Sequence, residues 1–485
     1  MLQLPADCLD NILENLDDDR YTLHSCVLVN HLWCEISVRI FWRNGYNYNI
    51  SNFKTLVFCL PNESKEILSK NGITIVTPTT KFPTFNYASF CKLFSVNRVQ
   101  RKIETLLSNE QTISPQILED NTNIVVQEIC KMFMNQISSL KGLDLFIYKG
   151  MKAPIFILYP KAKDCLKNLS VLYCHSDISS EIFYQLSQIC HNISTLHIVG
   201  RCCISNRLAD LIFVQKNLKH FILSQRSDSR LLDYSSLVTK LSNTLIKLNL
   251  YEHNYVSLSF IAKFSNLQEL RLSLEDKEDY VNFEKLSYAS FSQLKILKFR
   301  YSRPDNESLA RFLENNGKNL NELYISFENS SYNNNSLNSV ISKFCTNLRK
   351  FSGGFKSNEL EMLELILKNC KYLKSIEIFC GGKLLSEKEA LSEVVKYSHE
   401  NISEIILRHY FCTQPEKLLP KELEALIVSL ANYVPRRSLS LVIVTNDYCK
   451  MSLDKNEKNI KVIKKYIDLG VIKNFKIRGY DDEFN

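Results

Sequence analysis

The chain has 485 residues, of which 45% are apolar and 23% charged, a composition typical of folded proteins. This length exceeds one ordinary core, so we expect two or three domains or a repeat array. The formal net charge of +8 is mild for the length and makes nucleic-acid binding unlikely as a main role. No apolar run is long enough to predict a membrane span.

The sixteen cysteines show no C-x-x-C spacing, which removes the common zinc-finger signatures. The first residues are acidic and lack a basic segment followed by an apolar run, so we expect no secretory signal. Reduced thiols and a cytoplasmic or nuclear location follow from that expectation. The phosphate-loop, dinucleotide and nucleophile-elbow glycine motifs are also absent from the sequence. We therefore expect no enzyme activity, no cofactor and no metal.

The first predicted elements are short helices between residues 4 and about 43. Pro5 suits a helix start, because it lacks the N–H that a first turn leaves unpaired. An apolar stripe at helical spacing follows, formed by Leu9, Ile12, Leu13 and Leu16. A second apolar cluster, residues 23–29, leads to Trp33. About 40 residues rarely hold a core alone, so this surplus of apolar side chains predicts a surface that a partner buries.

The pattern LP-x-x-x-L-x-x-IL-x-x-L, then CVLVNHLW and a tryptophan nine residues on, resembles an F-box. The resemblance implies a three-helix module, here assigned to residues 1–45, that docks onto a Skp-family adaptor and through it onto a cullin. It also implies a set of adaptor-facing or supporting positions: Leu4, Pro5, Leu9, Ile12, Leu13, Leu16, Val29 and Trp33. The alternative is that part of this set only packs the module against itself or against the first repeats.

Residues 46–135 do not show the period that follows them, and their apolar spacing predicts mainly helices. We interpret them as a helical connector and an N-terminal cap, because a solenoid needs a cover on its first open edge. A flexible linker is disfavoured, because Phe, Leu and Ile remain frequent here.

From residue 136 to 485 one phrase recurs: apolar, two others, apolar, one other, apolar. Eleven copies start at Leu140, Leu169, Ile193, Leu218, Leu245, Leu267, Leu294, Leu320, Leu348, Leu373 and Ile402. The copy at Leu348 is broken by glycine, and looser copies start at Leu439 and Ile472. Helical patterns fill the gaps, which predicts one half-buried strand and one helix per repeat of about 26 residues. Such units bury their apolar faces only by stacking, so we predict an α/β solenoid preceded by a small all-α module.

These units resemble leucine-rich repeats of the cysteine-containing kind. Cys190, Cys345 and Cys370 each stand three residues before the first apolar position of a copy, and we interpret them as small buried residues at helix ends. The Asn or Cys expected eight residues after the first leucine is absent, so the buried ladder of that side chain is in doubt.

The residues between the apolar strand positions predict the recognition surface on the concave sheet. Candidate target-binding residues are Lys247, Tyr251, Arg271, Lys298, Arg300 and Tyr324. The four bases would form a stripe suited to an acidic or phosphorylated segment. The alternative is a solvated charged face that Glu269 and Glu322 partly neutralise.

The combined layout predicts the substrate-recognition subunit of a Skp–cullin–F-box ubiquitin ligase, whose repeats capture a target protein not named by the sequence. The alternative is a non-catalytic repeat protein that acts as a binding or scaffold protein outside ubiquitination, with RNA or a phosphoprotein as its ligand.

Overall fold

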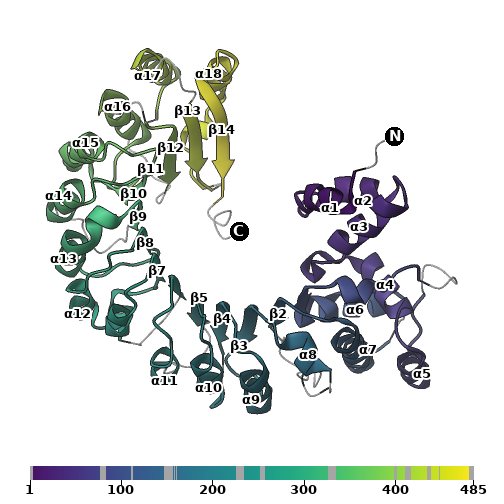
Figure 1. Cartoon of the computed structure of the whole chain (residues 1–485). Coiled ribbons are helices and arrows are strands. Elements are labelled where there is room, and N and C mark those ends of the chain that lie inside the picture. Colours follow the sequence, from purple (N-terminus) through teal and green to yellow (C-terminus); the bar gives the residue numbers. More distant parts are fainter. Residues whose placement is uncertain are drawn as a thin grey trace. The chain divides into compact units, whose positions relative to one another are not determined.

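The computed structural model describes residues 4–76, 83–110, 113–146, 157, 159, 161–201, 203–225, 234–251, 257–325, 335–397, 401–409, 417–433, 439–446 and 448–479. The chain divides into two compact units, Met1–Thr244 and Leu245–Asn485, and each has its own strands and helices (Figure 1).

The first unit begins with helices and continues into alternating strands and helices. Its helices are α1 (Ala6–Glu14), α2 (Arg20–Val27), α3 (His31–Phe41), α4 (Ile50–Phe58), α5 (Asn62–Lys70), α6 (Val96–Glu110), α7 (Pro115–Gln136), α8 (Ala162–Leu166), α9 (Ser180–Ile189), α10 (Leu208–Phe213) and α11 (Ser235–Val238). Its strands are β1 (Leu93–Ser95), β2 (Gly142–Leu145), β3 (Val171–His175), β4 (Thr195–Gly200) and β5 (His220–Gln225).

The second unit continues the alternation. Its strands are β6 (Lys247–Tyr251), β7 (Glu269–Ser273), β8 (Ile296–Phe299), β9 (Glu322–Ile325), β10 (Lys350–Gly354), β11 (Ser375–Cys380), β12 (Glu404–His409), β13 (Leu439–Val444) and β14 (Ile472–Arg478). Its helices are α12 (Phe283–Ser287), α13 (Asn306–Asn316), α14 (Asn335–Phe344), α15 (Leu360–Asn369), α16 (Glu387–Tyr397), α17 (Pro420–Tyr433) and α18 (Glu457–Asp468).

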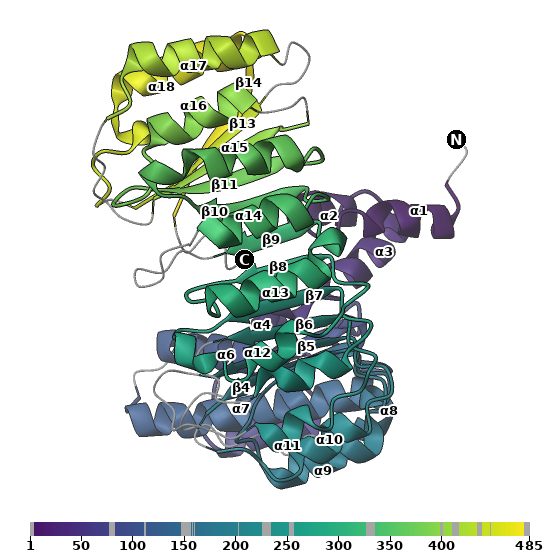
Figure 2. The same ribbon diagram turned by 90° about the vertical axis from the view of Figure 1, so that its left-hand side faces the viewer.

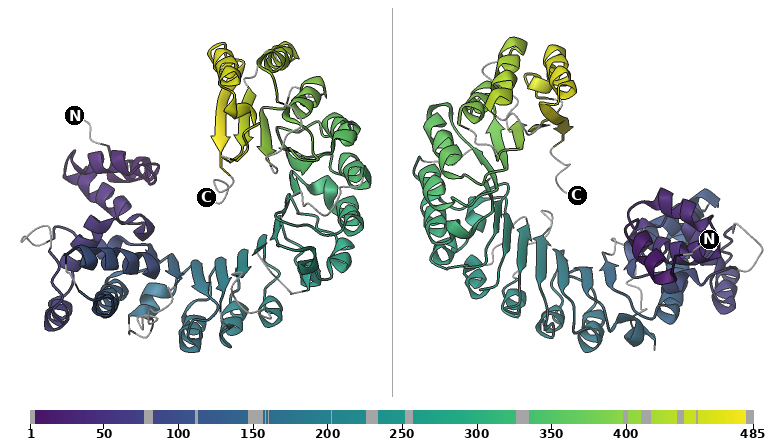
Figure 3. Two further views of the ribbon diagram at one scale, coloured as in Figure 1. Left: turned by 180° about the vertical axis from the view of Figure 1, so that it is seen from behind. Right: turned by 45° about the horizontal axis from the view of Figure 1, so that its top comes forward.

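Within each unit the strands pair in parallel, in the order in which they occur in the chain. Figure 2 shows helices α13 to α17 of the second unit stacked one upon the next, and Figure 3 shows the strands of each unit with helices on one side. The fold class predicted from the repeat, an α/β solenoid behind an all-helical N-terminal region, is confirmed.

The predicted apolar triplets form the core between strands and helices. In the copy at Leu267, for example, Leu267, Leu270 and Leu272 are fully buried. The copy at Leu348 lacks a third large side chain, and the Phe351 ring takes that space: a Cβ on Gly353 would lie 2.8 Å from it. The strand continues through this glycine, because Gly353 lies within β10.

Two copies differ from the sequence prediction. Strand β13 pairs Leu441 and Ile443 with the core residues Ile405 and Leu407 of β12, so its copy starts one residue earlier than Leu439. Strand β1 lies inside the segment that we interpreted as helical. Its Phe94 pairs with the core residue Leu143 of β2, so the sheet begins before residue 136.

Backbone hydrogen bonds link each repeat to the one before it. The residue after the first apolar position donates its N–H to the corresponding carbonyl of the preceding repeat; Ser170 to Lys141 and Arg349 to Asn321 are examples, at 2.9 and 2.7 Å. In one repeat a glutamine stands at the place of the buried cysteine: Gln215, three residues before Leu218, accepts from Ile193 N through its side-chain oxygen at 2.9 Å. The repeats are thus connected without the usual side-chain ladder.

Cys190, Cys345 and Cys370, which stand three residues before the first apolar position of a repeat, are buried, as predicted. The Cys190 thiol donates to the carbonyl of Leu166, and the Cys370 thiol to the carbonyl of Cys345, each at 3.4 Å. Burial raises the pKa of Cys190 and of Cys370 to about 12. These thiols are neutral and act as small core residues that bridge neighbouring repeats.

Candidate interaction surfaces

The N-terminal helices α1, α2 and α3 enclose a small apolar core. Its buried members are Leu9, Leu13, Leu23, Cys26, Ile36 and Ile40. Leu16 and Trp33 pack against it with part of their surface exposed. Asp19 and Asn30 cap the second and third helices by accepting from the backbone N–H groups of Thr22 and Trp33, at 3.1 and 3.0 Å. The sequence between residues 4 and 43 thus forms three helices with a core of their own.

The structure separates the candidate adaptor-binding residues into two groups. Leu9 and Leu13 are each only 1% exposed, so they support the module from inside and cannot contact a partner directly. Ile12 and Val29 are 50% and 57% exposed. Leu4 and Pro5 are exposed as well. We therefore reassign Leu9 and Leu13 from the interface to the core.

The two sides of helix α1 differ. On one side Asp10 forms an ion pair with Arg39 of α3, and Glu14 forms one with Arg43 just after that helix, at 2.7 and 3.0 Å. These pairs fix which side of α1 turns toward α3. Ile12 lies on the other side, because residues 10 and 12 are 200° apart on an α-helix.

Further apolar surface lies at the turn between α2 and α3. Leu28, which the sequence reasoning did not single out, is 76% exposed beside Val29. Large apolar side chains this exposed on a small module are candidates for burial by a partner. We call Leu4, Pro5, Ile12, Leu28 and Val29 the module's apolar surface.

The module is attached to the first strand of the sheet. The Arg43 carbonyl accepts from Lys92 N at 2.8 Å, and Asn44 forms a parallel bridge with Leu93 of β1. Trp42 is buried, with its ring 4.7 Å from that of Tyr87. A Cβ on Gly45 would lie 2.5 Å from the carbonyl oxygen of Leu93, so only glycine allows this approach. The end of the module thus pairs directly with the first strand of the sheet, although helices α4 and α5 lie between the two in the sequence.

The helix-free side of strands β6 to β9 holds the predicted target-binding residues. They are joined there with two glutamates: Lys247 pairs with Glu269 at 3.2 Å, and Lys298 pairs with Glu322 at 3.1 Å. Arg271 also forms an ion pair with Glu269. We call these five residues the ion-paired face. Each of its three bases has a carboxylate partner within the sheet, which supports the alternative of a partly neutralised, solvated charged face over a free basic stripe.

The remaining candidates lie at the margins of this face. The Arg300 guanidinium lies over the Tyr324 ring, 5.9 Å from its centre. Tyr324 also meets Phe379 edge to face at 6.0 Å, and Phe379 is buried against Leu384. Tyr251 is half-buried, and its hydroxyl lies 3.4 Å from the amide nitrogen of Asn249. These aromatic side chains are held by neighbours of their own sheet.

Burial and two lysines act on Glu322 in opposite directions. Burial alone would raise its pKa, but Lys298 and Lys350 outweigh it, and the net pKa is lowered. The carboxylate is therefore charged at neutral pH and balances the lysines on both sides.

The helix-free side of β2 to β5 is different, and sequence reasoning missed it. Four rings, Phe146, Tyr173, His175 and His197, lie with centroids 5.0 to 6.0 Å apart. We call these rings the aromatic face. Aromatic residues and histidines stand at the outward strand positions of the first three copies. The sequence prediction of the binding surface did not include them.

One histidine of the aromatic face, His197, is held in its neutral form. Burial, together with His175, lowers the pKa of His197 to about 4. Its Nε2 lies 3.4 Å from the hydroxyl of Ser224. Asp144 is the neighbouring acid; burial raises its pKa although the Ser95 hydroxyl donates to it at 2.6 Å. At neutral pH His197 is therefore uncharged, and it lies beside Phe146 and Tyr173, which belong to residue types enriched at protein interfaces.

Within the residues that the structure describes, no group of three His, Cys, Asp or Glu side chains could hold a metal ion. Over the same residues, no helix combines the length and the apolar character needed to cross a bilayer.

No protein-family model matches the chain, and neither does any curated protein. Among solved structures, the leucine-rich-repeat-containing protein LegL7 from Legionella pneumophila matches with 15% identity and a TM-score of 0.35, over 62% of this chain and 94% of LegL7. A chain of the yeast Rad7 and Elc1 complex matches with 14% identity and a TM-score of 0.39, over 92% of this chain and 94% of that one. At these scores neither likeness bears on function, and the leucine-rich-repeat layout rests on the strand order, register and buried triplets of the chain itself.

Proposed function

We propose that the chain is the substrate-recognition subunit of a Skp–cullin–F-box ubiquitin ligase, located in the cytoplasm or the nucleus. It has no catalytic role of its own in this proposal. Its N-terminal module docks onto a Skp-family adaptor, and the repeats capture a target protein. Proximity to the ubiquitin carrier then raises the effective concentration of the target.

The observation that carries this proposal is the three-helix module. Its apolar surface is exposed although the same helices bury an apolar core, and its last residues pair with strand β1. Such a surface gains free energy when a partner covers it. A direct attachment to the sheet transmits the position of a docked adaptor to the repeats without a flexible hinge.

Affinity for a Skp-family adaptor tests the proposal. We expect the double variant Ile12→Asp, Val29→Asp of the full chain to bind a recombinant adaptor at least 100-fold more weakly by isothermal titration calorimetry, because both charges would be buried in the interface. The melting temperature should hardly change, since both side chains are exposed in the free chain. Asn11→Asp is the matched control: it places the same charge on an exposed position of α1 and should leave affinity unchanged.

Three outcomes would redirect the interpretation. Unchanged adaptor affinity of the double variant would refute the F-box assignment. In a precipitation of the full chain from cell extract, recovery of the adaptor without a cullin would favour the alternative, a binding or scaffold protein that works outside ubiquitination. RNA binding with a steep dependence on salt would favour a nucleic-acid ligand instead.

A further inference from the structure

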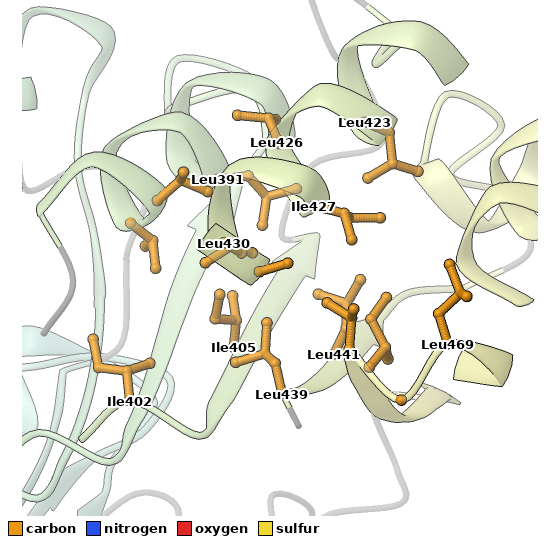
Figure 4. Close-up of a pocket in the computed structure, with 16 residues that line it drawn as sticks. Leu391, Ile402, Ile405, Leu423, Leu426, Ile427, Leu430, Leu439, Leu441 and Leu469 are labelled. Atoms are coloured by element: carbon orange, nitrogen blue, oxygen red, sulfur yellow. The ribbon is translucent and has the colours of Figure 1, made fainter. Parts of the chain in front are cut away.

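The second unit contains an apolar cavity of about 300 Å³ between helix α17 and strands β12 and β13 (Figure 4). Ile427 and Leu430 line it from the helix, and Ile405 and Leu441 from the strands. Every described lining residue is aliphatic or glycine. The cavity belongs to the layer between the sheet and the helices of the second unit.

The cavity follows from the residues that this repeat uses. In an earlier repeat of the same unit, Phe283 packs against Phe299 and Phe312, with ring centroids 6.1 and 5.7 Å away. Among the described residues that line the cavity, none is aromatic. Leucine, isoleucine and valine therefore leave space where the earlier repeat holds rings.

The backbone in the cavity wall is already satisfied. At the turn into β14, the Val471 carbonyl accepts from Leu439 N at 3.0 Å, and Val471 N donates to the Tyr466 carbonyl at 3.0 Å. The preceding Gly470 has a φ of 74°, the left-handed conformation that closes a helix end. Because no described lining residue has a polar side chain, these residues offer water few hydrogen-bonding partners.

We propose that this cavity binds the alkyl chain of a small ligand. An apolar cavity of about 150 Å³ in another protein stays dry and takes up benzene or xenon, and an empty cavity costs free energy in proportion to its volume. The alkyl chain enters beside Leu469, which is 63% exposed at the cavity margin. A polar end group stays outside, because the lining has nothing to bind it. The proposal is independent of adaptor binding.

Displacement of a fluorescent probe tests it. We expect full-length protein to bind 1-aminoanthracene saturably, and both decanol and decanoate to displace the probe, because the alkyl chain is the part that binds. Displacement by neither compound overturns the proposal. Displacement by decanoate alone also overturns it, because the end group would then be the part that binds.

Filling the cavity provides the matched variants. Val394→Phe places a ring in the lining and should weaken probe binding at least tenfold while raising the melting temperature. Leu367→Phe in α15, a fully buried position outside the lining, should leave probe binding unchanged and lower the melting temperature. Leu430→Phe, from the partly exposed side of α17, gives a second filling variant should Val394→Phe fold poorly. Undiminished probe binding in a folded filling variant overturns the proposal.

Discussion

The aromatic face of the first unit and the ion-paired face of the second occupy the same position in the repeat, yet they differ in chemistry. Outward strand positions hold Tyr173 and His197 on the aromatic face, but Arg271 and Lys298 on the ion-paired face. The bases of the ion-paired face already have carboxylate partners on their own sheet. The comparison teaches that the number of charged residues in a strand is a poor guide to the charge available to a ligand.

A target protein would meet different costs on the two faces. Binding to the ion-paired face requires the removal of water from ion pairs that already satisfy one another, with little Coulomb energy gained in return. The aromatic face offers rings whose desolvation is favourable. We therefore favour the aromatic face as the place where a target docks, in place of the stripe predicted from sequence.

The largest effect is expected from truncating the aromatic face. The double variant Phe146→Ala, Tyr173→Ala should reduce target capture about 100-fold, because central aromatic residues contribute most to interface energies. Quantitative mass spectrometry of proteins captured from cells with degradation blocked would measure it. Tyr251→Ala, which removes the tyrosine beside the ion-paired face, is the control and should leave the captured set intact. A larger loss with Tyr251→Ala would reverse our assignment of the two faces.

The second-largest effect is expected on the free energy of unfolding at acid pH. His197 has a pKa of about 4 in the folded chain, below the ordinary value of 6.5, so the unfolded chain binds the proton more tightly. Stability is then fully present above pH 6.5 and is lost as pH falls toward 4. Between pH 7.5 and 5 this amounts to about 2 kcal/mol. Urea unfolding at both pH values should show a loss in the wild type that exceeds the loss in His197→Gln by about that amount.

The comparison with His197→Gln removes the contribution of neighbouring titratable groups from this measurement. Asp144 has a raised pKa, which acts with the opposite sign at acid pH, but it is the same in wild type and variant. Equal pH dependence of the two proteins would mean that His197 is not buried in its neutral form.

The repeat architecture was predictable from sequence, because a buried triplet recurs wherever a strand faces the helices. Strand β1 was missed because the buried triplet around it, Cys91, Phe94 and Val96, contains no leucine. The separation of Ile12 from Leu9 was also out of reach, since both lie on one apolar stripe and only packing against α3 decides which is buried. The ion pairs depend on cross-strand register, which residue spacing leaves open.

The smallest effect comes from uncovering charge on the ion-paired face. Glu322→Gln would leave Lys298 and Lys350 without their shared carboxylate, at a cost of about 0.5–1 kcal/mol in unfolding free energy. The face should then bind heparin more tightly, so the variant should elute from a heparin column at higher salt than the wild type. Glu404→Gln is the control, because that carboxylate accepts from the Ser375 hydroxyl at 2.7 Å rather than from a lysine in the described part of the chain. If both variants elute with the wild type, the lysines are not what Glu322 neutralises, and the contrast between the two faces would have to rest on their rings alone.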